Sequence, residues 1–155
     1  MILILAVGQR QPDWVNVAVG DYLNRFPVDH RPSVKEVKSE PRNTGKSVSA
    51  MMAAEADRLR AAIPKGAAVI ALDEQGEAMN TARFSQFVQK AQQDWPHVVF
   101  LIGGPDGLDP TLKSECAALL RLSSMTLPHG MVRVMLSEAL YRAWSIAARH
   151  PYHRN

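Results

Sequence analysis

The stretch Ala67-Ala-Val-Ile-Ala-Leu72 contains no polar side chain, which is typical of a β-strand buried on both faces of a sheet. Segments whose apolar residues recur at helical spacing lie on either side of it, at residues 47–63 and 81–93. A buried strand between two helices is the repeating unit of a parallel sheet whose two faces are covered by helices. The stretch therefore predicts the α/β class.

The same alternation continues toward both ends of the chain. Further strands are expected at residues 2–8, 33–38, 97–102 and 119–123. Further helices are expected at residues 12–26, 110–118 and 130–148. The strand at 33–38 alternates only weakly, so we expect it near a sheet edge. The prediction is one domain, residues 1–155, with a mostly parallel sheet and helices on both faces.

Composition limits the classes of protein. The chain has 155 residues, of which 46% are hydrophobic and 21% charged, and this balance is globular rather than disordered or fibrous. The single cysteine, Cys116, excludes an internal disulfide and fits a reducing compartment. No apolar run reaches the roughly 18 residues that a transmembrane helix needs, and no signal peptide pattern occurs. We therefore expect a cytoplasmic protein without a membrane partner.

Positive charge is concentrated near the C-terminus. Residues 121–155 contain five Arg and one Glu, a net charge of +4, whereas the first 120 residues have a net charge of −1. Arginine forms paired hydrogen bonds to phosphate and stacks on bases. A solvated helix face is one interpretation of this charge. A surface for nucleic acid or an anionic ligand is the other.

Two loops follow predicted strands at the edge of the sheet where α/β proteins bind ligands. In Leu101-Ile-Gly-Gly-Pro-Asp-Gly-Leu108, Gly103 permits a close approach of the main chain to a ligand, and Pro-Asp-Gly favours a turn. The loop Leu122-Ser-Ser-Met-Thr-Leu-Pro-His-Gly130 offers main-chain groups and apolar walls that suit an adenine or a thioether. Both could be ordinary connections. The chain contains neither the dinucleotide-binding glycine motif nor a P-loop.

The tail His150-Pro-Tyr-His-Arg-Asn155 combines an aromatic ring, imidazoles and a guanidinium group that could stack on a base and hold a phosphate. Pro151 predicts that the last helix stops near His150 and that residues 152–154 leave it as a mobile segment. A frayed end is the alternative. No acidic cluster accompanies the histidines, so we expect no metal site.

Four segments together resemble the ribosomal RNA large subunit methyltransferase H family. This is a family of small SPOUT-class enzymes that methylate N3 of a pseudouridine in 23S rRNA. The segments are residues 101–107, 122–129, 131–146 and 150–154, and the resemblance covers essentially the whole chain. Asp106 stands where many members have Glu, so we assign its side chain no chemistry.

The resemblance implies a SPOUT α/β fold with a C-terminal trefoil knot, although general rules make true knots rare. It implies S-adenosylmethionine as the cofactor, in contact with Leu72, Gly103, Leu122, Ser123, Ser124, Met125, Thr126 and Leu127. It also implies a homodimer in which one subunit holds the cofactor while RNA-facing groups of the other complete the site. The implied substrate is pseudouridine 1915 in helix 69 of an assembled 70S ribosome.

Methyl transfer from a sulfonium to the imide nitrogen requires loss of the N3 proton. Candidate bases are Glu138, His153 and His129. Candidates for contacting phosphate or stabilising the developing imidate are Arg133, Arg142 and Arg154. Glu138 and Arg142 also have the spacing of an ordinary surface helix pair. Two other functions stay open: a SPOUT methyltransferase that acts on tRNA, and a non-enzymatic α/β module that binds RNA.

Overall fold

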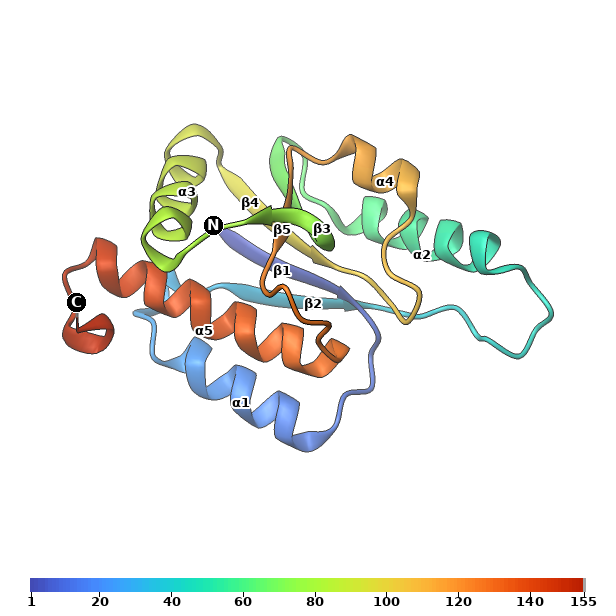
Figure 1. The fold of residues 1–155 in the computed structure, drawn as a ribbon, viewed down its shortest axis with the longest axis horizontal. Helices are drawn as coiled ribbons and strands as arrows, with labels where there is room; N and C mark the ends of the chain where they lie inside the picture. The colour runs from blue at the N-terminus through green and yellow to red at the C-terminus, as the bar shows by residue number, and fades with distance from the viewer. Residues whose placement is uncertain (155) are drawn as a thin grey trace.

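The computed structural model describes residues 1–154 as a five-stranded sheet with helices packed on its two faces (Figure 1). The strands are β1 (Ile2–Val7), β2 (Ser33–Val37), β3 (Ala67–Ala78), β4 (His97–Ile102) and β5 (Ala118–Arg121). The α-helices are α1 (Asp13–Asn24), α2 (Val48–Ala62), α3 (Thr81–Asp94), α4 (Pro110–Glu115) and α5 (His129–Ala147). Two short 3₁₀ helices are η1 (Val28–His30) and η2 (Pro151–His153).

All pairings in the sheet are parallel, and the strand order is β2-β1-β4-β3-β5. The α/β class and the edge position of β2 are thereby confirmed. The central strands β1 and β4 are almost entirely buried, as their continuous apolar sequences predict. The trefoil knot stays a prediction.

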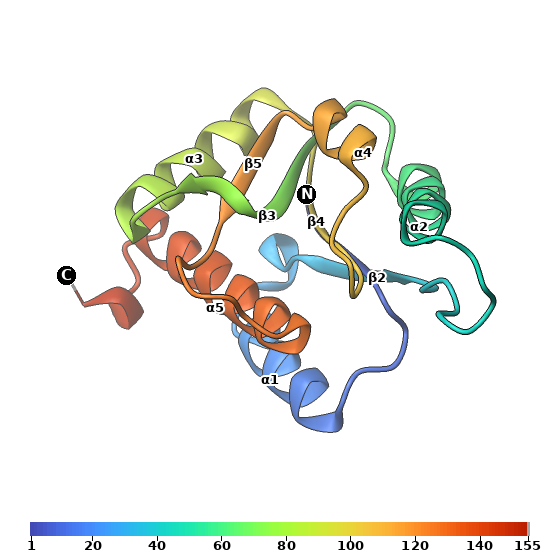
Figure 2. The same cartoon turned by 45° about the vertical axis from the view of Figure 1, so that its right-hand side comes forward.

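The two faces of the sheet bury separate apolar clusters, and the alternation of side chains along β1 shows the division. Ile4 lies in the cluster under α1, α3 and α5 together with Leu136, whereas Leu5 lies in the cluster under α2 and α4 together with Leu59. Figure 2 shows α1, α3 and α5 on one side of the strands and α2 and α4 on the other. The period of two along a strand produces this separation.

Three helices begin at a side chain that satisfies a free main-chain N–H of the first turn. Ser47, Asn80 and Asp109 accept hydrogen bonds from the third residue beyond them, at 3.1, 2.9 and 3.1 Å. Asp109 is followed by Pro110, whose fixed φ suits the first turn of a helix. These signals start α4 directly after the glycine-rich loop and so fix where that loop ends.

The prediction missed the second half of β3. This strand continues six residues beyond Leu72 and pairs with β5 again after an irregularity between Leu72 and Glu77. Residues 73–78 are mostly polar and lack the apolar pattern from which a strand is predicted. Gly76 permits the close crossing, because a Cβ there would lie 2.5 Å from the main-chain carbon of Leu120.

Four helices end earlier than predicted. The helices expected at residues 12–26 and 47–63 stop at Asn24 and Ala62. The helix expected at residues 110–118 stops at Glu115, and the helix expected at 130–148 stops at Ala147. Arg149 has a left-handed φ of 55°, so the chain leaves the helical path before Pro151. Within residues 1–154, no helix is long and apolar enough to cross a membrane.

Candidate active site

A cavity of about 700 Å³ lies at the carboxyl edge of the sheet, beside the irregularity of β3 and where the chain leaves β4 and β5. Its volume is within the range of small-molecule sites. Seven of the eight residues expected to contact a cofactor line it: Leu72, Gly103, Leu122, Ser123, Met125, Thr126 and Leu127. The eighth, Ser124, is exposed beside them and is not part of the lining.

The glycine-rich loop is a tight turn that closes on itself. The N–H of Gly107 donates to the carbonyl of Gly104 at 3.0 Å, and Pro105 and Asp106 occupy the middle of the turn. Gly107 has a φ of 84°. A Cβ on Gly103 would lie 2.7 Å from the main-chain carbon of Gly107. The protein's own turn therefore already requires glycine at position 103, and its expected contact with a ligand stays a prediction.

The second loop keeps its main-chain groups available for a ligand. In the described part of the chain, one main-chain N–H of residues 123–127 makes a hydrogen bond within the protein, from Met125 to Ser123 Oγ at 2.9 Å. Unsatisfied main-chain donors and acceptors beside a cavity are suited to the polar edge of a purine. This loop fits the adenine end of S-adenosylmethionine.

An ion pair that sequence reasoning missed lies on the wall of the cavity. Lys113 Nζ is 2.8 Å from Asp73 Oδ2, and Asp73 Oδ1 accepts from the main-chain N–H of Gln75 at 2.8 Å. Burial alone would raise the pKa of Asp73, but the hydrogen bonds from Lys113 and Gln75 outweigh it, and the pKa lies below its ordinary value. The position of Asp73 directly after a buried strand was the available signal.

Arg133 is buried and bonded within the chain, with 4% of its surface exposed. Its Nε donates to His129 Nε2 at 2.9 Å and its Nη2 donates to the carbonyl of Gly8 at 2.7 Å, while Nη1 pairs with Glu36. The side chain thus joins α5 to β1 and β2. In this structure the Arg133 guanidinium is enclosed and already paired. Its expected role, contact with phosphate or stabilisation of the developing imidate, stays a prediction.

His129 is the one candidate base that lines the cavity. Burial lowers the pKa of its imidazole, the charge of Arg133 lowers it further, and a hydrogen bond to the main chain of Gly103 partly opposes both effects. Because Nε2 accepts a hydrogen bond from Arg133, that nitrogen carries no proton. His129 is therefore neutral at pH 7 and holds Arg133 in place.

This arrangement predicts that the protein loses stability as the pH falls from 7 to 5.5. The unfolded chain takes up a proton at the ordinary histidine pKa of about 6.5, whereas the folded chain resists protonation of His129 because its pKa is lowered. The unfolded state therefore binds more protons in this window, and acid favours it. Melting temperatures at several pH values test this, with His129→Gln expected to weaken the dependence. An unchanged dependence in that variant would contradict it.

The other end of α5 holds a cluster formed with the tail. Glu138 Oε1 accepts from Arg142 Nε at 2.8 Å and from the hydroxyl of Tyr152 at 3.0 Å, and the Arg142 guanidinium lies 4.9 Å from the centre of the Tyr152 ring. His153 Nδ1 lies 3.3 Å from Ser145 Oγ. Residues Pro151–His153 thus form η2 and pack on α5, which corrects the prediction of a mobile segment. Asn155 lies outside the described residues.

Burial and the neighbouring Glu138 carboxylate raise the pKa of Tyr152. The phenol therefore stays protonated and donates to Glu138 at neutral pH. Glu138 also borders a smaller hollow of about 290 Å³ that shares Leu122 with the main cavity. Among the described residues of the tail cluster, Glu138 is the one that lines this hollow.

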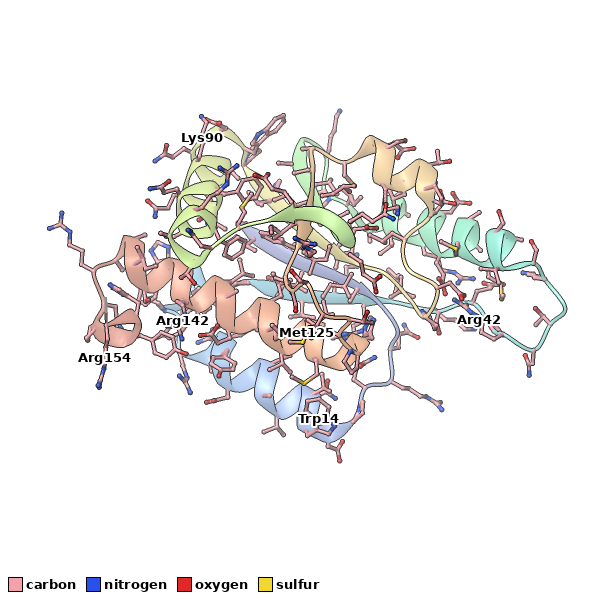
Figure 3. The ribbon with its side chains drawn as sticks, viewed as in Figure 1. Trp14, Arg42, Lys90, Met125, Arg142 and Arg154 are labelled. Carbon is pink, nitrogen blue, oxygen red and sulfur yellow. The ribbon has the colours of Figure 1, made fainter. Side chains whose placement is uncertain are left out.

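Arg142 and the tail residues lie far from the cavity within one chain. Arg142 is 13 residues beyond His129 on α5, which corresponds to about 20 Å along a helix. Figure 3 shows Met125 near the middle of the molecule and Arg142 and Arg154 toward its C-terminal end. The structure thus brings His129 to the cavity and leaves Arg142, His153 and Arg154 away from it.

No metal centre is found in residues 1–154, since no three His, Cys, Asp or Glu side chains gather closely enough to hold an ion. Cys116 caps α4 and packs against the cluster under α2 and α4. Burial raises the pKa of its thiol, and Glu115 raises it further. Cys116 is therefore a packing residue.

The parallel sheet, its glycine-rich turn and the cavity at its carboxyl edge define an α/β protein with space for a small molecule at the ends of its strands. The chain belongs to the SPOUT methyltransferase family, because a family model described as "Predicted SPOUT methyltransferase" matches residues 1–153. The resemblance read from the motifs is confirmed. Family membership implies a methyl donor of the S-adenosylmethionine type.

Similar curated proteins share one name, "Ribosomal RNA large subunit methyltransferase H". The protein from Bordetella avium (strain 197N) is 54% identical over 153 residues, which are 99% of this chain and 98% of that protein. With the same coverage of both chains, the proteins from Bordetella pertussis (strain Tohama I) and Burkholderia ambifaria (strain MC40-6) are 52% and 51% identical. The likeness therefore extends over the whole sheet and both loops.

Proposed function

We propose that this protein transfers a methyl group from S-adenosylmethionine to N3 of pseudouridine 1915 in helix 69 of 23S rRNA. The proposed substrate is the assembled 70S ribosome, and the proposed enzyme is a cytoplasmic homodimer. The observation that carries the proposal is the cavity: seven of the eight positions that match the family's cofactor contacts line one space at the carboxyl edge of the sheet.

The residues around the cavity fit the proposed cofactor. The unpaired main-chain groups of residues 123–127 suit the adenine, and Leu72 and Leu122 supply apolar walls. When bound, S-adenosylmethionine supplies an electrophilic methyl group on its sulfonium. The task of the protein is to hold that methyl in line with N3 and to exclude other orientations. Such positioning can lower the activation barrier by roughly several kcal/mol.

The proton on N3 needs an acceptor, for which the candidates are His129, Glu138 and His153. His129 is bonded to Arg133 through Nε2, so that nitrogen is engaged inside the protein. Glu138 and His153 therefore remain as the proposed bases. Arg142 and Arg154 are the proposed groups for the developing negative charge on the base or for a neighbouring phosphate, because they are less buried than Arg133.

The separation of about 20 Å along α5 between His129, at the cavity, and Arg142 supports the proposed homodimer. One chain cannot place Arg154 beside a methyl group held in its own cavity without a large rearrangement. A second copy can supply the tail to the first copy's cavity. The cofactor would then be held by one subunit while the other subunit contacts the RNA.

The choice of substrate is tested by comparing methyl incorporation into three RNAs. Labelled S-adenosylmethionine and the purified protein are incubated with unmethylated 70S ribosomes, protein-free 23S rRNA or bulk tRNA. We expect at least about tenfold more incorporation into ribosomes, because a small chain of net charge +3 has little surface with which to read naked RNA. Equal incorporation into free 23S rRNA would contradict the ribosome as substrate, and preferential incorporation into tRNA would favour the tRNA enzyme. A chain that binds no S-adenosylmethionine would favour the non-enzymatic module.

A further inference from the structure

A segment remote in sequence lies against the tip of the glycine-rich turn. The connection between β2 and α2 runs beside the loop that joins β4 to α4 (Figure 1), and Arg42 projects from it toward that loop (Figure 3). Arg42 Nη2 is 2.9 Å from Asp106 Oδ2. The same guanidinium lies 2.9 Å from Glu55 Oε2 and donates to the carbonyl of Glu40 at 2.6 Å. One side chain thus joins the turn to α2.

Glu55 lies beneath the turn and is almost fully buried, with 2% of its surface exposed. A Cβ on Gly104 would lie 2.9 Å from Glu55 Oε1, so this carboxylate is in close contact with the main chain of the turn. Glu55 Oε2 also accepts from the main-chain N–H of Glu40 at 2.9 Å. A buried carboxylate requires a charged partner, and Arg42 provides it.

The loop that presents Arg42 is itself held by a second set of ion pairs. The carboxylate of Glu40 binds both Lys46 and Arg58, and Arg58 also donates to the carbonyl of Lys38 at 3.0 Å. Hydrogen bonds from Lys46 and Arg58 lower the pKa of Glu40, so it remains charged at neutral pH. The main chain is therefore fixed on both sides of Arg42.

These contacts reach the cofactor cavity through Asp106. Asp106, Gly104 and Pro105 line the cavity, whereas Arg42 and Glu55 do not. We propose that Arg42 and Glu55 are positioning residues of the cofactor site, which hold the turn 104–107 in the conformation that receives S-adenosylmethionine. The inference depends on the proposed function for the identity of the ligand. It assigns a role to the connection between β2 and α2, to which no sequence motif assigned one.

The test uses Arg42→Ala and measures binding and turnover separately. We expect the Kd and the KM for S-adenosylmethionine to rise about tenfold, because the turn loses its tie to α2. The KM for ribosomes and kcat are expected to stay within about threefold of the parent values, since Arg42 touches neither substrate. Arg42→Lys should recover part of the affinity, because a single ammonium can replace only one of the paired contacts.

Arg60→Ala is the matched control. Like Arg42, Arg60 binds two carboxylates, here Asp57 and Glu115, but it projects from α2 and joins that helix to the end of α4 rather than to the turn. We expect this variant to bind S-adenosylmethionine with the parent affinity. A general loss of stability would affect both variants, whereas a positioning role affects Arg42 alone.

A double-mutant cycle tests the connection to the turn directly. Asp106→Asn removes the charge at the tip of the turn and leaves the pair between Arg42 and Glu55 in place, so the variant tests the idea even if Arg42→Ala fails to fold. We expect Asp106→Asn to weaken S-adenosylmethionine binding severalfold and to add little to Arg42→Ala. Independent effects in the double variant, or parent affinity in Arg42→Ala, would overturn the inference. If the parent chain itself fails to bind the cofactor, the proposed function fails instead.

Discussion

Removal of residues 152–155 is expected to lower the rate of methyl transfer to ribosomes at least about 100-fold while the affinity for S-adenosylmethionine stays within about twofold. The tail lies away from the cavity of its own chain, so its loss leaves the cofactor loops intact. Arg154 is exposed in a region of net charge +4, where RNA is attracted. Loss of one group that stabilises developing charge commonly costs a factor of about 10² to 10³ in rate.

Point variants separate the guanidinium from the rest of the tail. Arg154→Ala is compared with Arg149→Ala, because both arginines are exposed and have a left-handed φ, at 46° and 55°. We expect the first to lose most of its activity and the second to keep it. Near-normal turnover by the truncated chain would show that the tail is dispensable. The catalytic assignment would then move to Arg133, Glu138 and Arg142, of which Arg133 is the most buried.

Gly103→Val is expected to reduce S-adenosylmethionine affinity about 1,000-fold, which places binding beyond detection by calorimetry. Two main-chain atoms, of Gly107 and Leu108, lie 2.7 and 2.8 Å from the position of a Cβ, and neither can move without opening the turn. β4 ends before Gly103, so the pairing of the sheet and the cluster under α1, α3 and α5 remain. Circular dichroism should therefore show a folded chain.

Gly20→Ala is the control for this variant. Gly20 lies in α1, and a Cβ there meets nothing within 4 Å, so the substitution should leave binding unchanged and slightly favour the helix. Undiminished affinity in folded Gly103→Val would show that the turn does not shape the cofactor site. The cavity would then need another assignment.

Most strands and helices could be predicted because their apolar periodicity is local. The run Ala67–Leu72 was sufficient for the first half of β3. The second half could not be predicted, because residues 73–78 are mostly polar and become a strand only through pairing with β5. Similarly, α5 ends three residues before His150, where Pro151 predicted its end. The left-handed conformation of Arg149 takes the chain off the helical path.

The candidate site, too, could be predicted only in part. The two cofactor loops could be found because ligands collect at the carboxyl ends of parallel strands, and Gly103 marks one of those ends. The roles of side chains depended on partners distant in the sequence. Arg133 was taken for a surface cation, yet Glu36 and Gly8 enclose it. The pairs Asp73–Lys113 and Arg42–Asp106 join residues 40 and 64 positions apart, which no local pattern reveals.

The central claim is methylation of N3 of pseudouridine 1915, and mass spectrometry of 23S rRNA tests it most directly. Ribosomes are compared from the parent strain, from a strain lacking this protein, and from the deletion strain supplied with either the intact gene or the Gly103→Val variant. We predict that the fragment containing position 1915 is 14 Da lighter in the deletion strain, that the intact gene restores the methyl group, and that the variant does not. A fully methylated position 1915 in the deletion strain would contradict the account.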